Sequence, residues 1–329
     1  MQNAVISFPM LGSGFTFDPP VSFQFFGLRI YYYGIIIAVA LLIGVYYDFK
    51  RSRDFGLTED NILDLVIIAV PLAIIGARIL FVVTNPDQFF APGKWADIPK
   101  IWQGGLAIYG GLVLAVIGIY IYSRVKKISL GALLDGVSLG LMLGQVIGRW
   151  GNFINRELYG TETDVFCRMG LTLDGKTSYV HPVFIYESLW NFVCFLILHY
   201  VSKKYRKFNG QMFLMYIAWY GLGRTFIDGL RIDVVKILGG SIGAYQLIAL
   251  ITFFAASVIL VLLFAKYRNK PFMKPYIKAA TTDAAEADAD APVSTENDSS
   301  SSDIDNSTPI NNDSNDGGNS TDDVDPNIE

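Results

Sequence analysis

The chain has 329 residues, of which 52% are hydrophobic, 14% aromatic and only 17% charged. This composition, with its apolar residues gathered in long blocks, favours a polytopic membrane protein over a soluble one. The formal net charge of −4 is unevenly distributed, because the first 278 residues hold all 26 Lys and Arg but only 16 of the 30 acidic residues. Only Cys167 and Cys194 are cysteines, so neither a disulfide framework nor a metal cluster is indicated.

Seven apolar blocks each approach the roughly 20 residues that a helix needs to cross the hydrocarbon core of a bilayer. No cleaved signal peptide is predicted before them. Helices are expected, because open strands would leave backbone groups without hydrogen bonds in lipid. The predicted fold is all-α, with seven transmembrane helices in one domain over residues 1–278. The blocks run from about Ile30 to Tyr47, Ile62 to Val83, Leu106 to Tyr122, Leu130 to Ile147, Val183 to Val201, Gln211 to Ile227 and Ala244 to Ala265.

Lys and Arg are concentrated in alternate loops. Fifteen of them follow the first, third, fifth and seventh blocks, and nine are spread over the longer loops of the opposite set. The positive-inside rule then places the N-terminus outside and the C-terminus in the cytoplasm. The polar stretches Trp102–Gly111, Gly148–Gly160 and His181–Pro182 consequently share the extracytoplasmic leaflet.

Residues 279–329 hold fourteen Asp or Glu and no Lys or Arg. Such a segment cannot bury enough apolar surface to offset the entropy lost on ordering. We therefore expect a disordered acidic tail on the cytoplasmic side. A solvated acidic extension is favoured over a binding domain.

Charged residues inside apolar blocks are costly and usually face a cavity or a partner. Arg78 lies near the outer end of the second block. Along the sixth helix, which is expected to continue past the end of its apolar block, four polar side chains follow each other at intervals of four, four and three residues and so share one helix face: Tyr220, Arg224, Asp228 and Arg231. This face is either a structural salt-bridge ladder or an anion site in which the carboxylate orients the arginines. The presence of Arg149 in the same leaflet favours the anion site.

The stretch from Gly148 to Gly160 places two arginines, two asparagines and a glutamate at the end of an apolar run. A guanidinium matches phosphate oxygens bidentately, stays charged and is weakly hydrated, so arginines around one outer cavity would suit a phospholipid headgroup. For Arg149 alone the alternative is snorkelling at the interface. Asn152, Asn155 and Glu157 beside it make that account incomplete.

Two further segments on the same side have structural alternatives. The paired glycines on either side of Tyr109 allow the close approach of a neighbouring helix or of a ligand, and helix packing is the commoner use. His181 before Pro182 is either a proton-transfer group or a polar helix start, and the helix start is favoured.

The segment from Gly148 to Gly160 resembles the signature of the prolipoprotein diacylglyceryl transferase family, the first enzymes of bacterial lipoprotein maturation. The resemblance extends from roughly Ile30 to Ala265, and four more segments fit in the same order: Gly76-Ala77-Arg78, Gln103-Gly104-Gly105 with Gly110-Gly111, His181-Pro182 with Tyr186-Glu187, and Tyr220 to Arg224.

This resemblance implies transfer of the sn-1,2-diacylglyceryl group from phosphatidylglycerol to the lipobox cysteine of a prolipoprotein signal peptide. A thioether would form and glycerol phosphate would leave, at the outer face of the bacterial cytoplasmic membrane. The expected partners are then phosphatidylglycerol, the prolipoprotein and the lipid bilayer itself. No cofactor, metal or nucleic acid is expected.

The resemblance also implies roles for individual residues. Arg149 and Arg224 would bind the phosphate and stabilise the leaving group. Many members have a histidine between the paired glycines, where this chain has Tyr109, and a phenol of pKa about 10 is a poor base at neutral pH. Three alternatives for the proton acceptor remain open. It is Tyr109, it is His181, or the reaction needs no dedicated base. The other residues expected at the substrates are Tyr33, Arg78, Gln103, Asn152, Asn155, Glu157, Gly160, His181, Tyr220, Asp228 and Arg231.

Two rival classes are weaker. A lipid or anion transporter would also place arginines in an intramembrane cavity, but it should contain an internal repeat, and no persuasive repeat is found. An intramembrane protease would need a nucleophile with its base or two intramembrane aspartates. Asp64 and Asp135 lie near the predicted cytoplasmic ends of their blocks instead.

Overall fold

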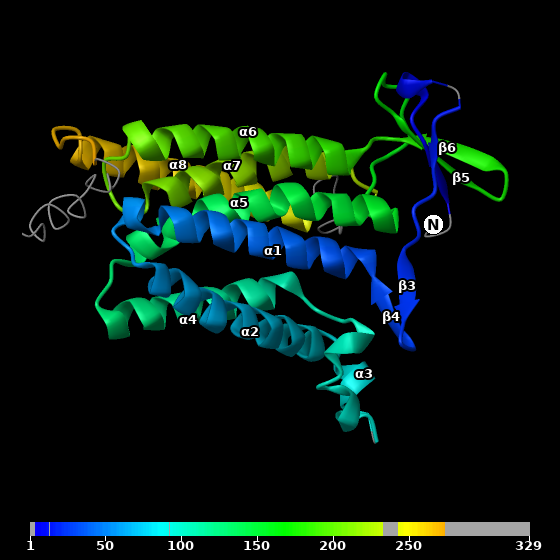
Figure 1. Ribbon diagram of the computed structural model, residues 1–329, viewed down its shortest axis with the longest axis horizontal. Coiled ribbons are helices and arrows are strands. Elements are labelled where there is room, and N and C mark those ends of the chain that lie inside the picture. The colour runs from blue at the N-terminus through cyan, green and yellow to red at the C-terminus, as the bar shows by residue number, and fades with distance from the viewer. Residues whose placement is uncertain (1–3, 13, 92, 233–242, 274–329) are drawn as a thin grey trace, which may run out of the picture. The chain divides into compact units, whose positions relative to one another are not determined.

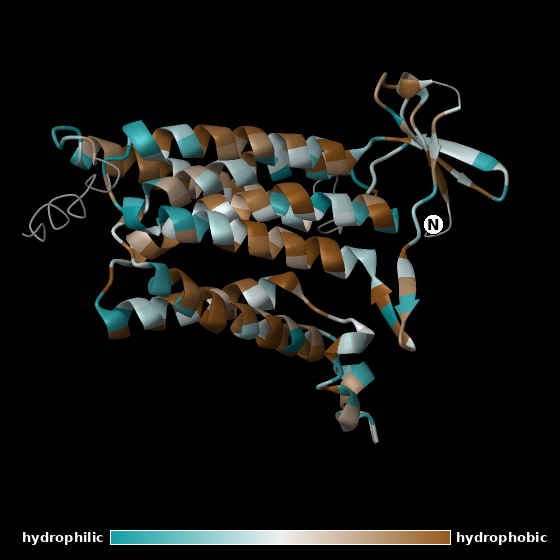
Figure 2. Cartoon of the chain, viewed as in Figure 1, coloured by the Kyte–Doolittle hydropathy of each residue, from teal (hydrophilic) through white to brown (hydrophobic). Residues whose placement is uncertain are grey.

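The computed structural model describes residues 4–12, 14–91, 93–232 and 243–273, and the predicted acidic tail lies outside them. Seven long helices make up most of this part and lie side by side (Figure 1). Hydrophobic residues follow each other along much of their length (Figure 2). The helices are α1 (Tyr32–Arg51), α2 (Glu59–Thr84), α4 (Ile108–Lys126), α5 (Leu130–Asn155), α6 (Val183–Lys204), α7 (Gln211–Ile227) and α8 (Ala244–Lys266).

Six of these helices are long and apolar enough to cross a membrane, namely α1, α2, α4, α5, α6 and α8. They correspond to six of the seven predicted blocks and confirm a polytopic membrane protein. The remaining block forms α7, which is only 17 residues long. The count of seven spans and the orientation of the chain therefore stay predictions.

Helices α2 and α4 pack closely through the glycines whose role the sequence left open. A Cβ atom on Gly110 would collide with the carbonyl oxygen of Gly76, and one on Gly111 would come within 2.6 Å of the Ala73 carbonyl oxygen. Small residues permit such backbone contacts between membrane helices. These two glycines of α4 therefore serve helix packing.

Strands that the sequence did not predict lie at one end of the helices (Figure 1). Four of them form an antiparallel sheet in the order β2-β1-β5-β6, with bounds Thr16–Phe17, Val5–Ser7, Met169–Leu173 and Lys176–Val180. A separate hairpin of β3 (Ser22–Phe25) and β4 (Leu28–Tyr31) leads directly into α1. The all-α prediction is therefore incomplete, because strands of two to five residues contain too few alternations to be recognised.

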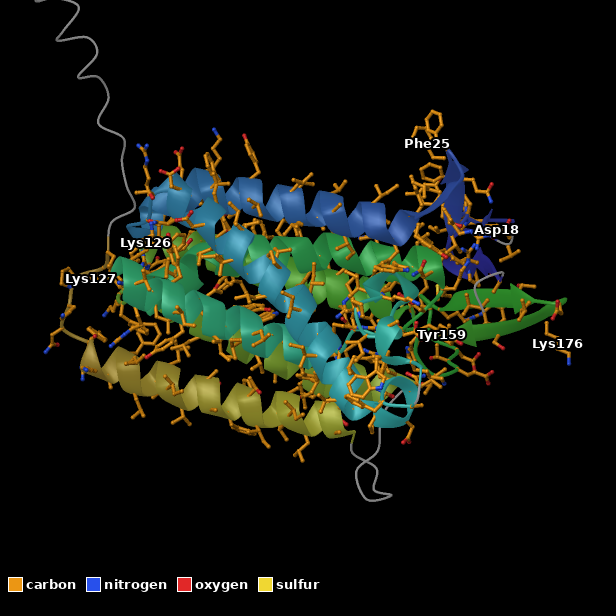
Figure 3. The ribbon with its side chains drawn as sticks, turned by 90° about the horizontal axis from the view of Figure 1, so that it is seen from below. Asp18, Phe25, Lys126, Lys127, Tyr159 and Lys176 are labelled. Carbon is orange, nitrogen blue, oxygen red and sulfur yellow. The ribbon has the colours of Figure 1, made fainter. Side chains whose placement is uncertain are left out.

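Short helical segments complete the connections. The loop between α2 and α4 contains α3 (Pro86–Phe89), η3 (Trp95–Asp97) and η4 (Ile101–Gln103). Others precede β2, follow α1 and follow α7: η1 (Pro9–Leu11), η2 (Ser52–Phe55) and η5 (Asp228–Leu230). Figure 3 places Lys126 and Lys127 at the opposite end of the helices from Asp18, Tyr159 and Lys176.

The four-stranded sheet packs on the ends of two helices. Ile6 of β1 and Leu171 of β5 are buried in a cluster with Phe153 of α5 and Phe184 of α6. The two phenylalanine rings stack with centroids 4.7 Å apart. This small core fixes the end of α5 and the beginning of α6, where the polar segments of the sequence analysis lie.

Arg156 is buried and belongs to this junction. Its guanidinium donates to the carbonyl oxygens of Ala4 at 3.1 Å and Pro19 at 2.7 Å and pairs with Asp18 at 2.6 Å. Burial lowers the pKa of Arg156, whereas the ion pair with Asp18 opposes that shift. Arg156 therefore holds the N-terminal segment against the end of α5.

Candidate functional site

Helix α5 continues through the polar stretch that was predicted to follow it. The apolar block was expected to end near Ile147, but the helix reaches Asn155 and ends with Arg156 in the left-handed conformation, at φ 52°. Residues three apart on a helix are neighbours. Arg149 accordingly donates to Asn152 Oδ1 at 3.5 Å.

Beyond the helix end, the chain turns back onto the same face of α5. Asn152 Nδ2 donates to Glu157 Oε1 at 2.7 Å, and Asn155 Nδ2 lies 3.4 Å from the same oxygen. Three of the predicted site residues are thus joined to Arg149 in one hydrogen-bonded group.

Glu187 of α6 joins the two arginines that the sequence analysis placed at the centre of the site. One oxygen of its carboxylate forms an ion pair with Arg149, and the other lies 3.6 Å from Arg224 Nη1. The Glu187 side chain is only 4% exposed, whereas those of the arginines are 18% and 17% exposed. The carboxylate is therefore enclosed between two guanidiniums that remain accessible.

The predicted ion pairs are present, although α7 ends at Ile227, so that Asp228 lies in η5 and Arg231 follows it in an extended conformation. Arg224 Nε lies 3.1 Å from one oxygen of Asp228, and Arg231 Nη1 lies 3.6 Å from the other. This is the salt-bridge ladder of the structural interpretation. Because Glu187 connects it to Arg149, the ladder is also one part of a site in which three helices meet.

A small cavity lies between α6 and α7, beside this meeting point. Glu187 and Arg224 line it together with Trp190, Asn191, Tyr220, Gly223 and Ile227. The indole nitrogens of Trp190 and Trp219 each donate to the other residue's carbonyl oxygen at 3.1 Å, which holds α6 against α7 beneath the arginine. The accessible guanidiniums of Arg149 and Arg224, held by a buried carboxylate, can bind an anion at fixed charges.

Two tyrosines reach the cluster from other helices. Tyr33 of α1 packs its ring over Gly151, where a Cβ atom would come within 2.7 Å, and interacts electrostatically with Glu157 and Arg149. Tyr109 is the second residue of α4, and its ring stacks on that of Tyr245 with centroids 5.5 Å apart.

Tyr109 also lies within electrostatic range of Arg224, Tyr220 and Asp228. The residue that stands in place of the expected histidine therefore interacts electrostatically with the α7 arginine.

Gly160 closes the site from the loop after α5. Its amide donates to the His181 carbonyl oxygen at 3.0 Å, and the next amide, of Thr161, donates to the Leu230 carbonyl oxygen at 2.7 Å. A Cβ atom on Gly160 would lie 2.6 Å from His181 Cβ and 2.9 Å from the Leu230 oxygen. Only glycine fits between the segment that starts α6 and the segment that carries Arg231.

Gly160→Ala is therefore expected to push these two segments apart and to misalign Arg231. The added methyl has nowhere to go, and overpacking of this kind costs about 1–3 kcal/mol. Thermal unfolding in detergent should detect the loss of stability, and any activity of the site should fall with it. Gly14→Ala is the matched control, because a Cβ atom at Gly14 has nothing within 4 Å. Equal unfolding temperatures for the two variants would contradict the argument.

Other predicted residues lie apart from the cluster. Arg78 directs its guanidinium at the loop before α4, where it donates to the carbonyl oxygens of Asp97 at 2.7 Å, Ile98 at 2.7 Å, Gly104 at 2.7 Å and Gly105 at 2.9 Å. None of these four partners belongs to the cluster of Arg149, Glu187 and Arg224. These contacts make Arg78 the centre of the loop that precedes α4.

His181 also lies beside the arginine cluster rather than in it, since its Nδ1 faces the Tyr186 hydroxyl at 3.3 Å. Its backbone groups bond Gly160 and Thr161, which agrees with the favoured structural role. The side chain of Gln103 falls outside the part of the chain that the structure describes.

Sequence reasoning missed the residue that organises the cluster. Glu187 was noted only as part of a segment shared with a family, although a carboxylate inside an apolar block is itself a signal of function. Asn191, four residues later on the same face of α6, lines the same cavity. The available signal was a charged residue within an apolar block. The sequence analysis considered this signal for the block that forms α7 but not for the block that forms α6.

Comparison with known proteins places this arrangement in a family. A sequence model described as prolipoprotein diacylglyceryl transferase matches residues 20–262. The chain is similar to proteins named phosphatidylglycerol–prolipoprotein diacylglyceryl transferase from several bacteria. The one from Finegoldia magna is 42% identical over 246 residues, covering 75% of this chain and 96% of the relative.

Two further relatives carry the same name. The protein from Clostridioides difficile is 39% identical, over 76% of this chain and 97% of its own length. That from Listeria monocytogenes is 37% identical, over 81% of this chain and 95% of its own. The matched range includes every helix from α1 to α7 and the whole arginine cluster. The protein therefore belongs to the prolipoprotein diacylglyceryl transferase family.

Proposed function

We propose that the protein transfers the diacylglyceryl group of phosphatidylglycerol to the cysteine thiol of a prolipoprotein. The observation that carries this proposal is the group of ion pairs in which the buried Glu187 joins Arg149 and Arg224, beside a small cavity that Glu187 and Arg224 line. The names of its relatives supply the two substrates. A lipid phosphate and a peptide thiol would then meet at the end of the helices where the sheet lies.

The reaction follows from the chemistry of these groups. The sulfur attacks the glycerol carbon that carries the phosphate ester, so that a C–S bond forms and the C–O bond breaks. The electron pair of the broken bond passes to the phosphate oxygen, and glycerol phosphate leaves. Arg149 and Arg224 neutralise the charge that develops there. The thiol proton must pass to an acceptor, because the thiolate is the nucleophile.

The orientation of the chain is part of the proposal. With α7 as a seventh span, the N-terminus lies outside the cell and the arginine cluster faces outward. The position of Lys126 and Lys127 at the far end of the helices supports this arrangement through the positive-inside rule (Figure 3). A reporter enzyme that is active only outside the cytoplasm should be active when it is fused in the turn after Asp174. Activity there of a reporter that works only in the cytoplasm would reverse the assignment.

Purified protein supplied with phosphatidylglycerol and a lipobox peptide tests the reaction directly. Mass spectrometry should detect a peptide heavier by one diacylglyceryl group, and a peptide with serine in place of the cysteine should stay unmodified. Movement of lipid without modification of the peptide would favour the transporter class instead.

Tyr109→Phe tests whether the phenol takes part in proton transfer. Because Tyr109 lies near Arg224 and Asp228, we expect its loss to reduce turnover by roughly 100-fold, the lower range for a positioned proton-transfer group. Tyr245→Phe is the control, since it removes the hydroxyl of the stacking partner and keeps both rings. Full activity of Tyr109→Phe would exclude its hydroxyl from proton transfer.

A further inference from the structure

The hairpin of β3 and β4 has one apolar and one polar face. Side chains of directly paired residues in antiparallel strands point to the same side. The register pairs Phe23 with Ile30 and Phe25 with Leu28, which puts four apolar side chains on one face. The other pairs put the polar side chains on the opposite face: Ser22 with Tyr31 and Gln24 with Arg29. Both Phe25 and Leu28 are more than half exposed, at 55% and 70%.

The turn of this hairpin carries a phenylalanine where the backbone disfavours one. Phe26 and Gly27 are the two residues between the paired strands, with φ angles of 47° and 79°. These values belong to a type I′ turn, in which Asn-Gly or Asp-Gly is usual and a bulky residue at the first position is unfavourable. Phe26 is nevertheless 91% exposed. In water, this residue would have an unfavourable backbone and a fully hydrated ring.

The position of the hairpin explains both features. Strand β4 ends at Tyr31 and α1 begins at Tyr32, so the hairpin continues directly from the end of a helix that is fit to cross a membrane. Exposed apolar side chains such as Leu42 cover that helix and form its lipid-facing surface. Figure 3 shows Phe25 projecting away from the helices at this end. Aromatic residues are enriched where spans leave the bilayer, whereas an isolated two-stranded hairpin is only marginally stable in water.

We propose that the β3–β4 hairpin lies in the membrane interface and inserts its apolar face and the Phe26 ring among the acyl chains. Arg29, on the opposite face, then reaches the lipid phosphates, which complement its charge. The hairpin anchors the end of α1 beside Tyr33 of the arginine cluster. This inference rests on α1 crossing the bilayer and is independent of the proposed reaction.

Depth measurements on spin labels test the proposal in the full-length protein. Cysteines are introduced by Gln24→Cys, Phe25→Cys, Phe26→Cys and Lys176→Cys, one at a time, with Cys167→Ser and Cys194→Ala. The protein is placed in vesicles of phosphatidylglycerol and phosphatidylethanolamine. For each label, the rate of collision with oxygen is divided by the rate of collision with a water-soluble nickel chelate, and this oxygen-to-nickel ratio is higher for labels buried in lipid. Lys176 is the matched control, because it lies in the other hairpin, beside the polar turn Asp174-Gly175.

The oxygen-to-nickel ratio is expected to be several-fold higher at positions 25 and 26 than at 24 and 176. Equal ratios at 24 and 25, or a ratio at 26 as low as that at 176, would overturn the proposal. Two other occupants of the apolar face would give different results, and each would also overturn it. Spectral broadening between labels would indicate a second copy of the chain, and a ratio that rises only when a lipobox peptide is added would indicate the peptide.

Discussion

Arg224→Ala is expected to lower the rate of diacylglyceryl transfer roughly 100- to 1,000-fold, the effect of removing one charge-stabilising donor from an active site. Arg224 lies 3.6 Å from Glu187 and 3.1 Å from Asp228, and it lines the cavity between α6 and α7. In the proposed reaction, its loss removes the positive charge that faces the leaving phosphate, and it leaves both carboxylates with less compensation. Single-turnover transfer to a lipobox peptide, normalised to folded protein, measures the effect.

Arg224→Lys distinguishes geometry from charge. A lysine keeps the charge but not the planar pair of donors that binds two phosphate oxygens at once, so this variant is expected to fail nearly as completely. Arg168→Ala serves as control, because Arg168 lies in the exposed loop after α5 and donates to the Asp164 carbonyl oxygen at 3.1 Å. Near-normal transfer by Arg224→Ala would remove Arg224 from the reaction, and full activity of Arg224→Lys would reduce its role to charge alone.

Glu187→Gln is expected to have the second-largest effect, with a distinct kinetic signature. Removing one member of a buried charge group costs roughly 3–5 kcal/mol, because the remaining charges lose their compensation. Without the carboxylate, Arg149 and Arg224 repel each other, and phosphate no longer competes with Glu187 for them. The maximal rate should therefore fall while the phosphatidylglycerol concentration for half-maximal rate also falls. Titration of the lipid in mixed micelles measures both quantities.

Asp135→Asn is the matched control for stability. Asp135 is fully buried near the start of α5, 3.4 Å from Arg206, and it accepts hydrogen bonds from the amides of Gly210 at 2.9 Å and Phe213 at 3.0 Å. This variant should unfold more easily but keep the normal half-saturating lipid concentration. An equal change of that concentration in both variants would mean that Glu187 acts only through stability.

Local patterns predicted the helices and one face of the site. The apolar blocks correspond to helices α1, α2 and α4 to α8. The intervals among Tyr220, Arg224, Asp228 and Arg231 anticipated the salt-bridge ladder that starts on α7. Both depend on the helical period alone, which a sequence displays. The end of α5 was less predictable, because Asn152 and Asn155 are poor helix formers that are held here by Glu157.

Contacts between distant segments could not be predicted in the same way. Arg78 and Arg149 look alike in the sequence, but the first binds the carbonyl oxygens of its own outer loop and the second binds Glu187. Which of the two is available for a ligand depends on how the loop before α4 folds, and no local pattern determines that. The role of Glu187 likewise depends on the packing of α6 between α5 and α7.

The pairing of β1 with β5 has a consequence for the order in which the protein assembles. Ile6 faces Leu171 in the sheet, so β1, which pairs with the nearby β2 on one side, lacks its partner on the other side until four of the long helices have been made. Long-range pairing of this kind is slow, because the intervening chain must first be brought together. The end of α5 that carries Arg149 is thus fixed late, and the enzyme cannot become active before its second half has joined the membrane.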